Sequence, residues 1–220
     1  MQMLHPLAGS VQQYIECMQR GEDLVRYCPK ICPLCHNKQT LISHGFYSRT
    51  VVDVELDCEI RVQRFLCRGC RRTVSLLPEF VLPYLRFTIT VIGSFLKARL
   101  VEGRTLKAAA EAAHQPHMPY QRGQHWVRRF QRQAEKISAA LTGLIRPAAA
   151  SDFVQRALSM LEQAGWIAAH RFLFERLHAH LLGWPSFLAP AGVPVTIRST
   201  VADTGSPPQS ICIDKESPPA

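Results

Sequence analysis

The chain has 220 residues, of which 47% are hydrophobic and 8% aromatic, and this indicates one or two small domains rather than one large enzyme core. A formal net charge of +9 and a pI near 9.4 favour a polyanionic partner. Residues 26–136 hold 19 Lys and Arg against 8 Asp and Glu, whereas the remaining residues hold 7 against 9. The basic character therefore belongs to the central part, although a basic surface that serves only solubility stays an alternative.

No run of 18 apolar residues occurs, and the first residues lack the charged and apolar regions of a secretory signal. We therefore expect a soluble cytoplasmic protein with no membrane partner. In that reducing compartment the eight cysteines favour metal ligands or buried thiols over disulfides.

The first predicted domain covers residues 25–78 and follows a helical lead-in over residues 1–24. It contains two C-x2-C pairs, a spacing that lets a tight turn direct both sulfurs at one metal ion. The four candidate ligands are Cys32, Cys35, Cys67 and Cys70. Four unrelated reduced cysteines remain the alternative.

Strand-forming residues over 40–52 and 59–66 predict a hairpin between the two cysteine pairs, and residues 73–77 predict a third strand. This order is that of a zinc ribbon. The Zn²⁺ would be structural, because four thiolates leave no coordination position for a substrate. Gly69, in the second turn, is expected to need a positive φ.

Five further residues have side chains that can ligate a metal ion. Cys28 and His36 lie near the first pair, but neither continues its spacing, and we interpret both as bystanders. The remaining cysteines are interpreted as free thiols: Cys17, Cys58 and Cys212.

A helix-turn-helix unit is predicted over residues 84–141, after a proline-bounded bridge. Thr88 and Thr105 can cap helices over about 89–101 and 106–114. A turn with two prolines then leads to a helix over about 120–141.

The helix over 120–141 has an apolar and a polar face. Its apolar stripe is predicted to be core and consists of Trp126, Phe130, Ala134, Ile137 and Leu141. The opposite side and its borders carry the predicted DNA contacts Gln121, Arg122, Gln124, His125, Arg128, Arg129 and Arg132. Arg can pair with guanine and Gln with adenine in the major groove, so this helix is predicted to recognise bases. A solvated face of an ordinary helical bundle is the alternative.

Basic residues of the ribbon are predicted to contact phosphates without sequence preference. Arg71 and Arg72 are the main candidates, because they follow the second cysteine pair directly. The others are Arg49, Arg61, Arg64 and Arg68.

Residues 25–140 resemble the N-terminal DNA-binding regions of bacterial insertion-sequence transposases, and also a group of uncharacterised bacterial proteins. The resemblance rests on the two cysteine pairs, on His44-Gly45, and on the Leu77-Pro78 step before the helices. It implies zinc on the four cysteines and a recognition helix that begins near Tyr120. The chain departs from a complete transposase because no three-carboxylate catalytic domain follows.

The C-terminal third is predicted to contain a helical hairpin over 151–184 and a disordered tail over 191–220. The helices would run from a cap at Ser151-Asp152 to about 164, and from 166 to 182. They would pack on the helix-turn-helix or mediate homodimer or partner-protein contacts. Three histidines, His170, His178 and His180, lack the spacing of a helical metal site and are not proposed as ligands.

Together these patterns predict an α+β protein, with a four-cysteine zinc ribbon, an all-α helix-turn-helix unit and a C-terminal helical hairpin. We expect it to bind double-stranded DNA without being an enzyme, in association with a bacterial nucleoid. Its expected setting is a mobile element, as an accessory or catalytically incomplete transposase, or transcription regulation. The alternative is a zinc-ribbon protein-interaction module that has no sequence-specific DNA binding.

Overall fold

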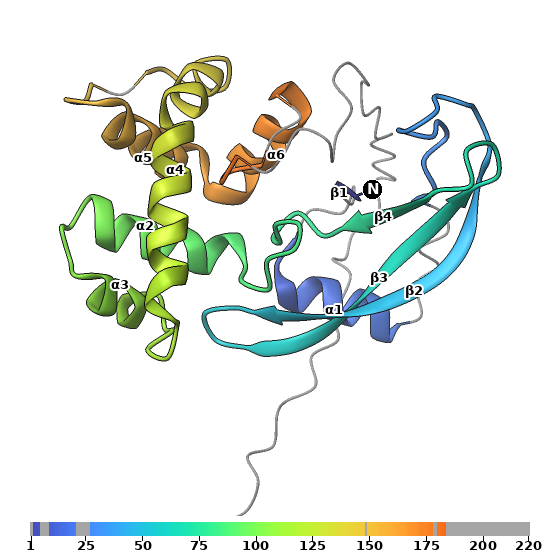
Figure 1. Ribbon diagram of the computed structural model, residues 1–220, viewed down its shortest axis with the longest axis horizontal. Coiled ribbons are helices and arrows are strands. Elements are labelled where there is room, and N and C mark those ends of the chain that lie inside the picture. The colour runs from blue at the N-terminus through green and yellow to red at the C-terminus, as the bar shows by residue number, and fades with distance from the viewer. Residues whose placement is uncertain (1, 5–8, 21–26, 148, 178–179, 184–220) are drawn as a thin grey trace, which may run out of the picture. The chain divides into compact units, whose positions relative to one another are not determined.

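The computed structural model describes residues 2–4, 9–20, 27–147, 149–177 and 180–183 (Figure 1). These residues form two compact units that divide between Arg86 and Phe87. The strands lie in the N-terminal unit and five of the helices in the C-terminal unit, so the α+β class is confirmed. The predicted tail over 191–220 lies outside the described residues.

The N-terminal unit is built on a four-stranded sheet with the order β1-β4-β3-β2. The strands β2 (Leu41–Val52), β3 (Asp57–Cys67) and β4 (Thr73–Leu77) pair in antiparallel fashion, as the sequence predicts. A register shift between Ser43 and Phe46 interrupts the β2–β3 hairpin. Gly45 lies in this irregularity with φ 76°, a conformation that glycine adopts without steric cost.

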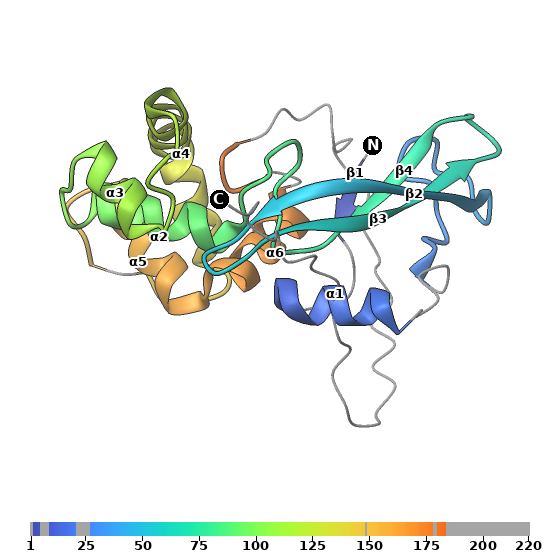
Figure 2. The ribbon, with the colours of Figure 1, turned by 90° about the horizontal axis from the view of Figure 1, so that it is seen from below.

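The lead-in is more than a helix, because strand β1 (Gln2–Leu4) pairs in parallel with β4. Helix α1 (Val11–Gln19) begins with a capping box at Ser10 and Gln13 and lies along the sheet (Figure 2). The Tyr14 hydroxyl donates to the Arg61 carbonyl at 2.9 Å, and the Tyr14 ring meets Phe80 edge to face. A three-residue strand carries too little periodicity to be predicted from its own sequence.

The proline-bounded bridge over residues 78–83 is buried in the N-terminal unit. Glu79 is only 4% exposed and accepts a hydrogen bond from the Gly9 N–H at 3.0 Å. The Arg49 guanidinium donates to the carbonyls of Leu82 and Leu85. These contacts fix the end of the bridge against the sheet.

The C-terminal unit contains five helices: α2 (Ile89–Leu100), α3 (Leu106–Ala112), α4 (Tyr120–Leu141), α5 (Phe153–Ala164) and α6 (Trp166–Leu177). The side chains of Thr88, Thr105 and Asp152 each accept a hydrogen bond from the backbone three residues further on, which confirms the predicted caps. The prediction that the last helix continues to residue 182 was wrong, because α6 ends at Leu177.

The core of this unit surrounds α4. Trp126 is fully buried and meets the rings of Phe87 and Phe95 edge to face at 5.1 and 5.4 Å. All five residues of the predicted apolar stripe are buried, and α5 and α6 pack on α4. No described helix has both the length and the apolar content needed to cross a membrane.

Candidate metal centre and candidate nucleic-acid interface

The four predicted cysteine ligands come together at one point of the N-terminal unit. Their sulfurs lie within 4.8 Å of one another, with 3.8 Å between Cys32 and Cys70 and 3.6 Å between Cys35 and Cys67. A disulfide needs about 2.05 Å, so these are separate thiols. A tetrahedral site with metal–sulfur bonds of about 2.3 Å requires sulfurs about 3.8 Å apart. The four cysteines can therefore hold a metal ion.

Both cysteine turns have the same backbone geometry. The N–H of the residue after each pair, His36 or Arg71, donates at 2.9 Å to the carbonyl of the first cysteine of its pair. The first cysteine in turn donates its own N–H to a carbonyl beyond the pair, at 3.0 Å for Cys32 and 2.9 Å for Cys67. This repetition arises because a C-x2-C turn closes around its first carbonyl.

The left-handed backbone positions follow the pairs instead of lying inside them. His36 has φ 59° and Arg71 has φ 61°. The predicted positive φ at Gly69 was wrong. A Cβ at Gly69 would lie 2.6 Å from the Asn37 side-chain nitrogen and 3.7 Å from the Cys35 sulfur, so the two cysteine turns approach each other closely at this position.

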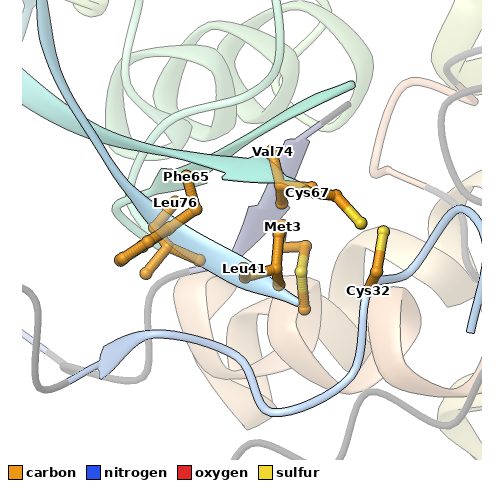
Figure 3. Close-up of a cluster of buried hydrophobic side chains, with 7 residues drawn as sticks. All are labelled: Met3, Cys32, Leu41, Phe65, Cys67, Val74 and Leu76. Atoms are coloured by element: carbon orange, nitrogen blue, oxygen red, sulfur yellow. The ribbon is translucent and has the colours of Figure 1, made fainter. Parts of the chain in front are cut away.

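The cysteine cluster is continuous with the hydrophobic core of the N-terminal unit. Cys32 and Cys67 are 0% exposed. Figure 3 shows their sulfurs pointing toward one another beside the core residues Met3, Leu41, Phe65, Val74 and Leu76. Loss of the cluster geometry would therefore disturb the packing of all four strands.

Thr40 is a neighbour of the cluster that sequence reasoning missed. Its hydroxyl lies 3.1 Å from the Cys67 sulfur and lowers the pKa of this thiol to about 6. Burial raises the pKa of Cys32 to about 12. The hydroxyl thus stabilises one thiolate, and a bound cation favours the deprotonated form of every ligand.

Other cysteines and His36 lie outside the four-thiol group among the described residues. The Cys28 sulfur instead lies 3.5 Å from the Leu41 carbonyl oxygen. Cys17 and Cys58 are buried thiols. Cys212 lies outside the described residues.

Most of the α4 residues predicted to contact DNA have the exposure that the helical wheel implies. Gln121, His125, Arg128 and Arg132 are exposed, and the border residues Arg122 and Arg129 are half-buried. Gln124, predicted on the side opposite the apolar stripe, is half-buried as well. In the N-terminal unit, Arg71 and Arg72 are both exposed.

Electrostatics and hydrogen bonds distinguish the members of this α4 face. Partial burial lowers the pKa of His125, and the nearby charges of Arg129 and Arg132 lower it further. Arg129 also donates to the Gly183 carbonyl at 3.1 Å, and the Arg122 guanidinium lies 5.3 Å from the Phe87 ring centre. Arg122 and Arg129 thus contribute to packing, whereas Arg128 and Arg132 extend into solvent.

The connection between α3 and α4 spans residues 113–119. It is longer than the three or four residues of a tight helix-turn-helix turn. Pro119 stands immediately before α4 without a side-chain cap, and His114 has φ 58°. The mutual packing of α2, α3 and α4 is nevertheless a three-helix arrangement.

One family model matches the chain over residues 32–115, and it is described as a domain of unknown function (DUF6431). The matched part contains both cysteine pairs and helices α2 and α3, and it ends before α4. No curated protein and no solved structure matches the chain.

Proposed function

We propose that this protein binds double-stranded DNA without catalysing a reaction, and that α4 is its recognition helix. The observation that carries the proposal is the two-sided character of α4. Its apolar stripe is buried, while Arg128 and Arg132 are exposed together with Gln121. An exposed helix with arginine and glutamine on one face has the hydrogen-bonding groups that read guanine and adenine in the major groove.

We further propose that Zn²⁺ is the metal held by Cys32, Cys35, Cys67 and Cys70. The four-thiolate set and the 3.6–3.8 Å sulfur separations match the ligand preference and bond length of zinc. Bound zinc would cross-link the two cysteine turns and thereby stabilise the sheet. Arg71 and Arg72, next to the second turn, would then be held where they can contact phosphates.

The charge of the chain supports the same proposal. Residues 26–136 carry most of the positive charge and include both the four-cysteine cluster and α4 up to Lys136. By the resemblance to insertion-sequence transposases, the protein would function in a mobile element. Transcription regulation is the other setting that suits a four-cysteine zinc site combined with a recognition helix.

The test selects, from a pool of random duplexes, those that bind the full-length, zinc-loaded protein. Matched RNA is the comparison, and binding is measured over a series of salt concentrations. We expect one duplex motif to be enriched and its binding to weaken steeply with salt. Arg128→Gln should weaken binding to that motif by about tenfold to a hundredfold, as loss of one arginine–guanine pair does. Arg146→Gln removes the same charge beyond the end of α4 and is the matched control.

Two outcomes would contradict the proposal. Weak and equal binding to duplex and RNA would mean that the charge is nonspecific, and protein partners would then be sought. Equal losses in Arg128→Gln and Arg146→Gln would exclude a base-reading role for α4.

A further inference from the structure

A groove of about 560 Å³ opens on the N-terminal unit, between its strands and residues 84–86. Its lining includes three arginines, three aliphatic hydroxyl residues and two tyrosines, namely Arg49, Arg64, Arg86, Thr50, Thr73, Ser75, Tyr47 and Tyr84. Among the described residues no carboxylate lines this groove. The three guanidinium groups give the groove a positive potential, which favours an anionic ligand.

Arg64 is the residue best placed to hold such an anion. Its Nε is buried and has no hydrogen-bond partner among the described residues. Its guanidinium carbon lies 5.8 Å from the centre of the Tyr47 ring, a stacking contact that fixes the group and leaves its N–H edges for a ligand. A buried donor without a partner is costly, so it favours a ligand that can accept from it.

The hydroxyl groups lie beside this arginine because of the strand register. Arg64 on β3 pairs with Ser75 on β4, so both side chains lie on the same side of the sheet. Thr73 is two residues from Ser75 and shares that side. Arg49, in contrast, already donates to the Leu82 and Leu85 carbonyls and frames the groove.

We propose that this groove binds a phosphate group of a nucleic-acid backbone, with Arg64 as the principal donor and Thr73 and Ser75 as hydroxyl donors. Guanidinium groups bind phosphate through paired N–H donors, and hydroxyl groups can donate hydrogen bonds to the remaining phosphate oxygens. The site adds a nucleic-acid contact in the N-terminal unit. It does not depend on base recognition by α4.

The experiment uses full-length, zinc-loaded protein and two probes: inorganic phosphate, and a fluorescein-labelled 20-base-pair duplex of random sequence. Arg64→Gln should abolish inorganic phosphate binding and weaken duplex binding about tenfold, with the salt slope falling by about one. The matched control is Arg20→Gln, which removes the same charge from an exposed residue at the end of α1. Arg20 belongs to the N-terminal unit and does not line the groove. The control should change either affinity less than twofold.

Two results would overturn the inference: equal effects of the two substitutions, and no effect of Arg64→Gln on duplex binding. If inorganic phosphate binding is lost while duplex binding is unchanged, the groove binds a free anion instead. Zinc content and the thermal melt report folding of each variant. If Arg64→Gln loses zinc, Arg64→Lys is used instead. Arg64→Lys should still weaken duplex binding at least threefold, because lysine lacks the paired N–H donors of the guanidinium group. An unchanged duplex affinity in Arg64→Lys would also overturn the inference.

A failed DNA selection is distinguishable from failure of this site. Random duplex binding that depends on Arg64, together with no enriched motif in the selection, would leave the groove in place and remove the recognition helix.

Discussion

Two buried histidines should make the C-terminal unit sensitive to mild acid. His170 is 0% exposed and His180 is 7% exposed, and their rings stack with centroids 5.4 Å apart. Both nitrogens of His170 and Nδ1 of His180 have no hydrogen-bond partner among the described residues. Burial lowers the pKa of His180 to about 4, and burial, His180 and Arg171 lower the pKa of His170 well below its ordinary value.

The sign of the effect follows from these lowered pKa values. In the unfolded chain both histidines bind a proton near pH 6.5, whereas in the folded unit they stay neutral. Their contribution to stability is therefore fully present above about pH 6.5 and is lost as the pH falls toward 4. For His180 alone, a shift from 6.5 to about 4 corresponds to a loss of about 2 kcal/mol between pH 7 and pH 5.

Urea unfolding followed by tryptophan fluorescence measures this loss. All three tryptophans of the chain lie between residues 126 and 184, so the signal reports the C-terminal unit. With an m-value of about 1–2 kcal/mol/M, the His180 contribution alone should lower the wild-type midpoint by about 1–2 M from pH 7 to pH 5, and His170 should lower it further.

The control variant is His180→Phe, which keeps an aromatic ring against Phe174 but cannot bind a proton. Its midpoint should fall by about 1–2 M less than that of the wild type over the same pH range, and the fall that remains comes mainly from His170. The comparison also removes the contribution of His125, whose pKa is lowered too. If wild type and His180→Phe shifted equally, the burial argument would be refuted.

Two further substitutions test the metal centre and the helical packing. Cys67→Ser should release zinc and unfold the N-terminal unit, whereas Cys28→Ser should retain zinc; a stably folded, metal-free Cys67→Ser protein would contradict the structural role. Gly93→Ala would place a Cβ 2.7 Å from the Trp166 ring and should destabilise the C-terminal unit by about 1–3 kcal/mol, despite the better helix propensity of alanine. Urea midpoints measure the second effect, and an unchanged or higher midpoint would show that the ring moves aside at little cost.

Local sequence signals determined most of the elements. Thr88, Thr105 and Asp152 begin helices because a side-chain oxygen can accept the backbone N–H three residues on, within a few residues of sequence. The helical periodicity of residues 120–141 located α4, because its apolar residues recur along one face of the helix. The C-x2-C spacing likewise predicted which four cysteines gather, since each turn is formed by its own neighbours.

Contacts between distant residues were decided only by the tertiary structure. Strand β1 and the buried bridge depend on partners some 70 residues away, as in the bond from Gly9 to Glu79. In the sequence, Arg64 is one of several basic residues of the predicted ribbon. Only the pairing of Arg64 with Ser75 and the position of the Tyr47 ring place Arg64 in a groove. Helix caps and tight turns depend on residues that are only a few positions apart in the sequence. Which side chains meet across a sheet depends on how the strands pair, and short segments do not encode that pairing locally.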